Sequence, residues 1–208
     1  IGFLGILIVW FTFGHYKFSR FSLGKVIPAA KWKAMTICTM PILGFTMVFY
    51  SIMNLFHLDF LPKQMMEISY LGFLPYNIIG SFISAYIFFG AIQEELIRCG
   101  KKRWVQLLTL SIMMLPACMM SVTPSGDINV DLTVLGFITL CYCSWIYGKT
   151  RSTIILIVLY FVSNLVPFHF ESKVLGILLL IAGTALTIGG FAALSRKLPE
   201  MLVKDENE

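Results

Sequence analysis

The sequence has few charged residues for its length. Aspartate, glutamate, lysine and arginine make up 13% of its 208 residues, whereas hydrophobic residues make up 58%. An average soluble domain carries about 25% charged residues, so the polar side chains are too few to cover a soluble globule of this size. The mean hydropathy is +0.83. This composition argues against a soluble domain and predicts a polytopic membrane protein, folded as an all-α helical bundle.

Cysteine pairs with metal-site spacing are also absent. The five cysteines lie in or beside apolar runs, at Cys38, Cys99, Cys118, Cys141 and Cys143. None forms a CxxC pair, so the sequence gives little support to a disulfide framework or a zinc ribbon. We expect small, apolar-tolerant residues inside a bundle.

The sequence contains several long apolar runs. We expect about seven transmembrane helices, at roughly 1–14, 34–56, 78–100, 104–122, 132–148, 152–168 and 174–194. A helix of about 20 mainly apolar residues spans a bilayer, and backbone groups in lipid are satisfied within such a helix. We therefore expect a single integral membrane domain over residues 1–208. Its motif-bearing core covers about 78–168, and residues 195–208 form a cytoplasmic tail.

Two finer expectations concern the loops and the helix contacts. The segment 57–77 is the longest expected outer loop, and its apolar residues suggest that it lies on the membrane surface or on the bundle. In the last span, Ala185 and Gly189 are small residues four apart, a spacing that allows close helix packing in membranes.

Basic residues gather on one side of the expected bundle. If the spans alternate, all lysines and arginines except Lys63 and Lys173 lie on the same side. Cytoplasmic loops are enriched in these residues, so we expect a cytoplasmic C-terminus. The net charge of +5 then reflects orientation and contacts with anionic lipid, and we expect no nucleic-acid partner.

Two adjacent glutamates interrupt the third span. Glu94 and Glu95 lie in the segment GAIQEELIRCGKKRW, residues 90–104. A charged group inside a membrane span is costly and marks a candidate functional site. Neighbouring carboxylates also resist double ionisation, which suits a general base. A structural alternative stays open, in which Glu94 pairs with Arg98, one helical turn further on, and Glu95 pairs with Lys102, about two turns further on.

This segment resembles the first motif of the CPBP family, the CAAX-protease and bacteriocin-processing (ABI family) membrane proteins. The motif is typically EExxxR followed by glycine, and Glu94, Glu95 and Gly100 fit it. Arg98 stands one place early, and Cys99 occupies the arginine position.

A second match to the family lies downstream, where members carry a helix that ends in HxxxN or HxxxD. Asn164 matches the asparagine, and Tyr160 stands in the histidine position. Members also carry FxxxH between these motifs, and Cys118 fits that histidine position best. The resemblance covers about residues 90–168.

The resemblance implies the fold and chemistry of an intramembrane endopeptidase. In active members a glutamate activates water, and histidine and asparagine residues hold a metal or stabilise the oxyanion. The three histidines of this chain are His15, His57 and His169, so no histidine occurs between Leu58 and Phe168. Glu94, Glu95, Tyr160 and Asn164 are then vestigial site residues, and we expect no cofactor. An active form would require a divalent metal such as zinc.

We therefore expect a catalytically impaired CPBP-like protein of a bacterial cytoplasmic membrane. It would bind a membrane protein or peptide in an intramembrane cavity around Glu94, Glu95, Tyr160 and Asn164. One alternative is an active endopeptidase in which Glu94 or Glu95 activates water. Another is a transporter or channel subunit in which the glutamate pair binds a cation or proton.

Overall fold

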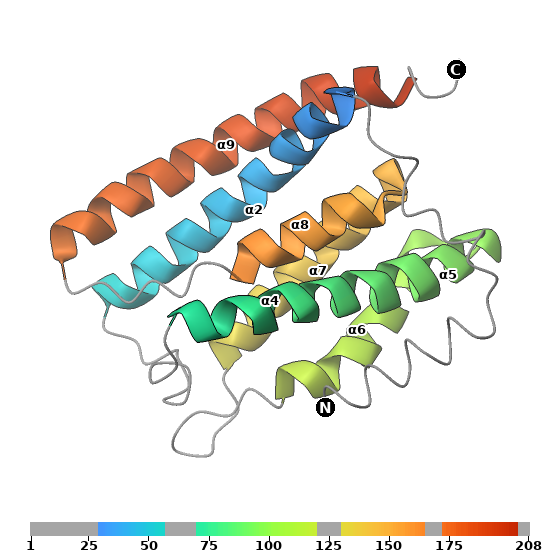
Figure 1. Cartoon of the computed structure of the whole chain (residues 1–208), viewed down its shortest axis with the longest axis horizontal. Helices are drawn as coiled ribbons and strands as arrows, with labels where there is room; N and C mark the ends of the chain where they lie inside the picture. Colours follow the sequence, from blue (N-terminus) through green and yellow to red (C-terminus); the bar gives the residue numbers. More distant parts are fainter. Residues whose placement is uncertain (1–28, 57–69, 120–129, 165–171, 204–208) are drawn as a thin grey trace.

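The computed structural model describes residues 29–56, 70–119, 130–164 and 172–203. Every element in these ranges is helical, which confirms the all-α prediction. Figure 1 shows them as a bundle of elongated helices. In chain order they are α2 (Ala29–Leu55), α4 (Tyr70–Ser84), the π-helix η2 (Ala85–Gln93), α5 (Glu94–Arg98), α6 (Arg103–Met119), α7 (Val130–Thr150), α8 (Thr153–Asn164) and α9 (Lys173–Val203).

The expected spans coincide with these helices from the second span onward, and the first span lies outside the described residues. Two described helices are long and apolar enough to cross a membrane by length and composition. They are Trp32–Leu55, within α2, and Lys173–Leu198, within α9. A bundle with seven spans remains a prediction.

Two predicted boundaries are wrong. Residues 70–77 belong to helix α4 rather than to a loop, because Asn77 is buried and its amide donates a hydrogen bond to the carbonyl of Phe161 in α8 at 3.4 Å. The helix continues across Pro75 with the loss of one backbone hydrogen bond. At the other end, α9 runs to Val203, so the expected tail is helical over residues 195–203, where the buried Leu198 packs in the core.

The third span contains a nine-residue π-helix, which the sequence did not predict. Helices α4, η2 and α5 follow one another without interruption, and η2 ends immediately before Glu94. A π-helix closes i→i+5 hydrogen bonds, so its turns are wider than those of an α-helix. The segment turns Tyr86, Phe89 and Gln93 into the interior. The π-helix therefore sets the direction in which the side chain of Glu94, the next residue, points from the helix.

Helices α2 and α9 are in close contact through glycines. A Cβ atom added to Gly44 would lie 2.5 Å from the carbonyl oxygen of Gly183 and from the backbone nitrogen of Thr187. A Cβ atom on Gly190 would lie 2.8 Å from the ring of Pro41. The contact face of α9 therefore contains Gly183, Thr187 and Gly190.

The predicted packing through Ala185 and Gly189 has no counterpart among the described helices. Both residues are exposed, and no described atom lies within 4 Å of a Cβ atom built on Gly189. Because a helix turns about 100° per residue, the two small-residue rows of α9 point in different directions. The sequence contained both rows, and packing against α2 selected the row of Gly183.

The helix ends that carry basic residues meet at one end of the bundle. Figure 1 places the start of α2, the α5–α6 turn, the α7–α8 turn and the end of α9 at the right-hand end of the view. These segments contain Lys33, the run Lys101–Arg103, Lys149, Arg151 and the pair Arg196–Lys197. We call this the basic end. Lys173, at the start of α9, lies at the opposite end.

Candidate functional site

The glutamate pair opens a short helix that ends in a glycine motif. The N–H of Gly100 bonds to the carbonyl of Ile97 at 2.9 Å, and the N–H of Lys101 bonds to the carbonyl of Leu96 at 3.0 Å. This is the Schellman pattern, in which a residue in left-handed conformation follows the helix. Gly100 supplies that conformation with a φ of 65°. The chain then turns directly into α6, and this turn keeps Glu94 close to the basic end.

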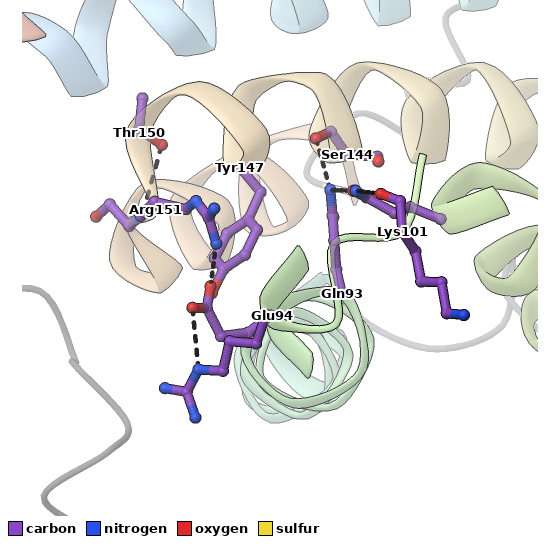
Figure 2. A network of polar contacts seen from close by, with 10 residues as sticks. Gln93, Glu94, Lys101, Ser144, Tyr147, Thr150 and Arg151 are labelled. Carbon is purple, nitrogen blue, oxygen red and sulfur yellow. Dashed lines mark hydrogen bonds and ion pairs between the residues drawn. The ribbon is translucent and has the colours of Figure 1, made fainter. Parts of the chain in front are cut away.

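The carboxylate of Glu94 is held by three side chains, as Figure 2 shows. Arg151 Nη1 lies 2.7 Å from Glu94 Oε2, and the hydroxyl of Tyr147 donates to the same oxygen at 3.0 Å. Arg98 Nε lies 3.5 Å from the other oxygen, Oε1. Tyr147 belongs to α7, and Arg151 stands in the turn after it. The carboxylate therefore fastens α5 to the α7–α8 turn, and we call this contact the Glu94 clamp.

The backbone of Arg151 is unusual. Its φ is 49°, in the left-handed region that residues other than glycine rarely adopt. Its N–H bonds to the carbonyl of Tyr147 at 2.8 Å and ends the last turn of α7. A left-handed residue with a Cβ atom costs about 1 kcal/mol. The ion pair with Glu94 and this hydrogen bond offset that cost and hold the guanidinium toward α5.

A buried amide network lies beside the clamp. Gln93 Nε2 donates to Gln106 Oε1 at 3.3 Å and to the carbonyl oxygen of Ser144 at 3.0 Å. Gln106 Nε2 in turn donates to the carbonyl oxygen of Lys101 at 2.9 Å. Gln93 is 1% exposed and Ser144 is fully buried. These contacts join η2, the α5–α6 turn, α6 and α7 in the interior (Figure 2).

Two buried polar atoms of this network have no hydrogen-bond partner in the described part of the chain. They are Gln93 Oε1 and Ser144 Oγ. Buried polar atoms are usually paired, and an unpaired one costs about 1–3 kcal/mol. The interior next to Glu94 therefore holds unused hydrogen-bonding capacity.

The other predicted site residues lie in different places. Glu95 is exposed on α5, and Cys99 is exposed immediately after that helix. Tyr160 is buried in α8. Cys118 lies in α6 and Asn164 ends α8, but both side chains lie outside what the structure describes.

Phe89 stands between the clamp and the buried tyrosine of α8. Its ring centroid lies 6.2 Å from that of Tyr147 and 5.9 Å from that of Tyr160. Phe89 is fully buried, so its ring occupies the space that separates these two tyrosines. The structure thus brings Glu94 together with Tyr147 and Arg151, and it connects Tyr160 to them through an aromatic contact.

Sequence reasoning missed several residues of this site. Tyr147 and Arg151 lie 53 and 57 positions after Glu94, and no local pattern links residues so far apart. Gln93 and Gln106 did carry a signal, because each is an amide within or beside an apolar run. Such residues need hydrogen-bond partners in a bundle interior.

The chemistry available at the clamp is that of an ion pair. Two guanidinium groups and one hydroxyl surround a single carboxylate whose side chain is 24% exposed. Within the described ranges, no group of three histidine, cysteine, aspartate or glutamate residues lies close enough to hold a metal ion.

A comparison with protein-family models, with curated proteins and with solved structures finds no match to this chain.

Proposed function

We propose that this chain is a CPBP-like integral membrane protein without robust protease activity, which acts by binding a membrane protein or peptide. The observation that carries the proposal is the Glu94 clamp. Both carboxylate oxygens of Glu94 accept contacts from Arg98, Arg151 or Tyr147. Glu94, which resembles the catalytic base of the family, therefore links α5 to the α7–α8 turn.

The surface of α9 supports the membrane part of the proposal. This helix is strongly apolar, yet only 17% of its most apolar window is buried. Leu178, Ile181 and Ile188 are each more than half exposed. A core helix of a soluble protein buries such side chains, whereas a lipid-facing helix exposes them to hydrocarbon. Lipid is the solvent that fits this face of the bundle.

The geometry of Glu94 supports a structural role. A general base must lie within hydrogen-bond reach of the proton that it removes. Here Oε2 accepts from Arg151 and Tyr147, and Oε1 faces Arg98. A water molecule at Glu94 would compete with these three donors. The same contacts hold α5 against α7, as expected of a residue that links two helices.

The unpaired buried atoms support binding of a peptide-like group. Gln93 Oε1 is an acceptor, and Ser144 Oγ is both a donor and an acceptor. We propose that a membrane-embedded peptide displaces α5 from α7 and pairs its backbone N–H and C=O groups with these two atoms. Such pairs are favourable because lipid offers no competing hydrogen bonds.

The test combines cleavage with stability. We expect the purified protein to leave prenylated and leader peptides uncleaved with zinc, cobalt or manganese. We expect Glu94→Gln and Arg151→Gln each to lower the free energy of unfolding in detergent by about 1 kcal/mol. Because both variants break the same contact, the double variant loses less than the sum of the two.

A different result would contradict the proposal. Metal-dependent peptide cleavage that Glu94→Gln abolishes, with no change in thermal stability, would assign Glu94 to catalysis. Additive stability losses in the double variant would show that Glu94 and Arg151 are not coupled. Lys173→Gln, at the exposed start of α9, serves as a charge-matched control for Arg151→Gln.

An active endopeptidase is the second candidate, and η2 favours it. π-Helical segments occur frequently at functional sites, and this one ends directly before Glu94 and Glu95. In this alternative the exposed Glu95 activates water. Cleavage by the wild-type protein, lost in Glu95→Gln with unchanged folding, would favour this candidate over the first.

A further inference from the structure

The two ends of the α2–α9 pair bring cations together from distant parts of the sequence. The two helices run antiparallel side by side, so the start of α2 lies next to the end of α9 (Figure 1). The first turns of α2 contain Trp32 and Lys33, and the last turns of α9 contain Arg196 and Lys197. All four side chains are exposed.

The contact between Pro41 and Gly190 shows that these cations lie at one level of the bundle. Lys33 precedes Pro41 by eight positions, and Arg196 follows Gly190 by six. At 1.5 Å per residue, the two cations lie ~12 Å and ~9 Å along their helices from that contact. Buried Leu194 and Leu198 share a core cluster with Ala34 and Met35, so the two helices are still packed together at this level.

The surface next to this cluster is apolar. Phe191 is 48% exposed, and it precedes Arg196 by little more than one turn of α9. Trp32 is 64% exposed beside Lys33. Tryptophan is enriched at the level of lipid headgroups, between hydrocarbon and water. Tryptophan and cations therefore lie together where the apolar surface ends.

Tryptophan also lies beside cations at a second place on the basic end. Trp104 is 63% exposed, and it directly follows the cations Lys101, Lys102 and Arg103. Trp32 and Trp104 belong to different helices, α2 and α6, that begin at the same end of the bundle. A headgroup layer at this end of the bundle contacts both places, whereas a nucleic acid would not explain the apolar surface beneath them.

We propose that Trp32, Lys33, Arg196 and Lys197 form a docking surface for the headgroup of an anionic phospholipid. The inference rests on the membrane part of the proposed function. The headgroup phosphate pairs with Lys33 and with Arg196 or Lys197, and the acyl chains lie along the apolar face of α9. Glu200 follows Arg196 by one turn, but cations outnumber it at this end.

The experiment measures retained lipid by native mass spectrometry of the detergent-purified full chain, with phosphatidylglycerol and phosphatidylcholine as probes. We expect preferential retention of phosphatidylglycerol. The triple variant Lys33→Gln/Arg196→Gln/Lys197→Gln should lose that preference, by about fivefold per neutralised cation. Lys173→Gln, at the opposite end of α9, is the matched control and should retain lipid like the wild type.

A further variant tests whether charge or the shape of the side chain matters. Arg196→Lys preserves the charge and should preserve phosphatidylglycerol retention, whereas a merely structural role for arginine would reduce it. Equal retention of both lipids by the wild type, or equal losses in Lys173→Gln and the triple variant, would overturn the inference. So would competition by inorganic phosphate at the concentration of the lipid, because it would identify a free-anion site.

Membrane extraction separates the two proposals. If alkaline carbonate releases the chain from membranes, the proposed function fails at its first step. If the chain stays in the membrane and the triple variant still prefers phosphatidylglycerol, the docking surface alone fails.

Discussion

At the scale of single residues, Glu94 shows how context decides the role of a charge. The sequence identified it because a carboxylate inside an apolar run is costly. The expected pair with Arg98 is present, but the shorter contact is with Arg151 at 2.7 Å. Because Arg151 is 57 positions away, the sequence predicted a site without predicting its partner.

Substitutions at Gln93 and at Ser144 should have different effects on the free energy of unfolding. Gln93→Leu removes the donor to Gln106 Oε1 and leaves that acceptor unpaired, so we expect a loss of about 1–3 kcal/mol in the free energy of unfolding. Ser144→Ala removes a buried hydroxyl that has no partner in the described part of the chain. It should therefore be neutral or stabilising.

Thermal unfolding of both variants in the same detergent checks this prediction. Equal destabilisation by Gln93→Leu and Ser144→Ala would contradict it, because the serine hydroxyl would then be making a contact. Gln93→Glu is a useful companion, since it keeps the shape of the side chain but replaces the donating amide with a second acceptor oxygen.

At the scale of helices, the apolar runs predicted the elements well. The expected spans at 104–122 and 132–148 correspond to α6 and α7 within a few residues. The π-helix η2 was not predictable, because its nine residues have no composition that distinguishes them from the α-helix before them. Its presence depends on what Phe89 and Gln93 pack against.

The contact between α2 and α9 gives an element-scale prediction with an internal control. Gly44→Ala and Gly183→Ala place a Cβ atom within 2.5 Å and 2.8 Å of a backbone carbonyl oxygen. Overpacking of this kind costs about 1–3 kcal/mol. Gly189→Ala adds the same methyl group to the exposed face of α9, where no described atom lies within 4 Å. Because alanine is favoured over glycine inside a helix by about 0.5–1 kcal/mol, this variant should be neutral or stabilising.

Thermal stability of the three variants tests this contact, and the ranking matters more than the absolute values. A Gly189→Ala variant as unstable as Gly183→Ala would mean that a second interface covers this face of α9, in conflict with the observed contact face.

At the scale of the whole molecule, the separation of charge is the main organising feature. The basic segments lie far apart in the sequence, yet the alternating direction of the helices collects them at one end (Figure 1). An orientation with this end in the cytoplasm follows from the preference of cytoplasmic loops for lysine and arginine. This orientation is part of the proposal for a membrane protein.

The accessibility of Cys99 to a labelling reagent tests that orientation. It is exposed at the basic end, whereas Cys38 and Cys143 are buried. In a variant that retains Cys99 as its single cysteine, we expect a membrane-impermeant maleimide to label inverted vesicles and to leave intact cells unlabelled. Labelling of intact cells would reverse the orientation, and Cys99→Ser provides the background.

The sequence by itself determined the helical class, most of the helix positions and the sidedness of the charge. These properties follow from composition and from the spacing of apolar and basic runs, which are local along the chain. Tertiary structure decided the partners of Glu94, the contact face of α9 and the direction in which the side chains after η2 point. Each of these depends on atoms that distant segments bring together, such as Tyr147 and Arg151 against Glu94, and no local pattern contains them.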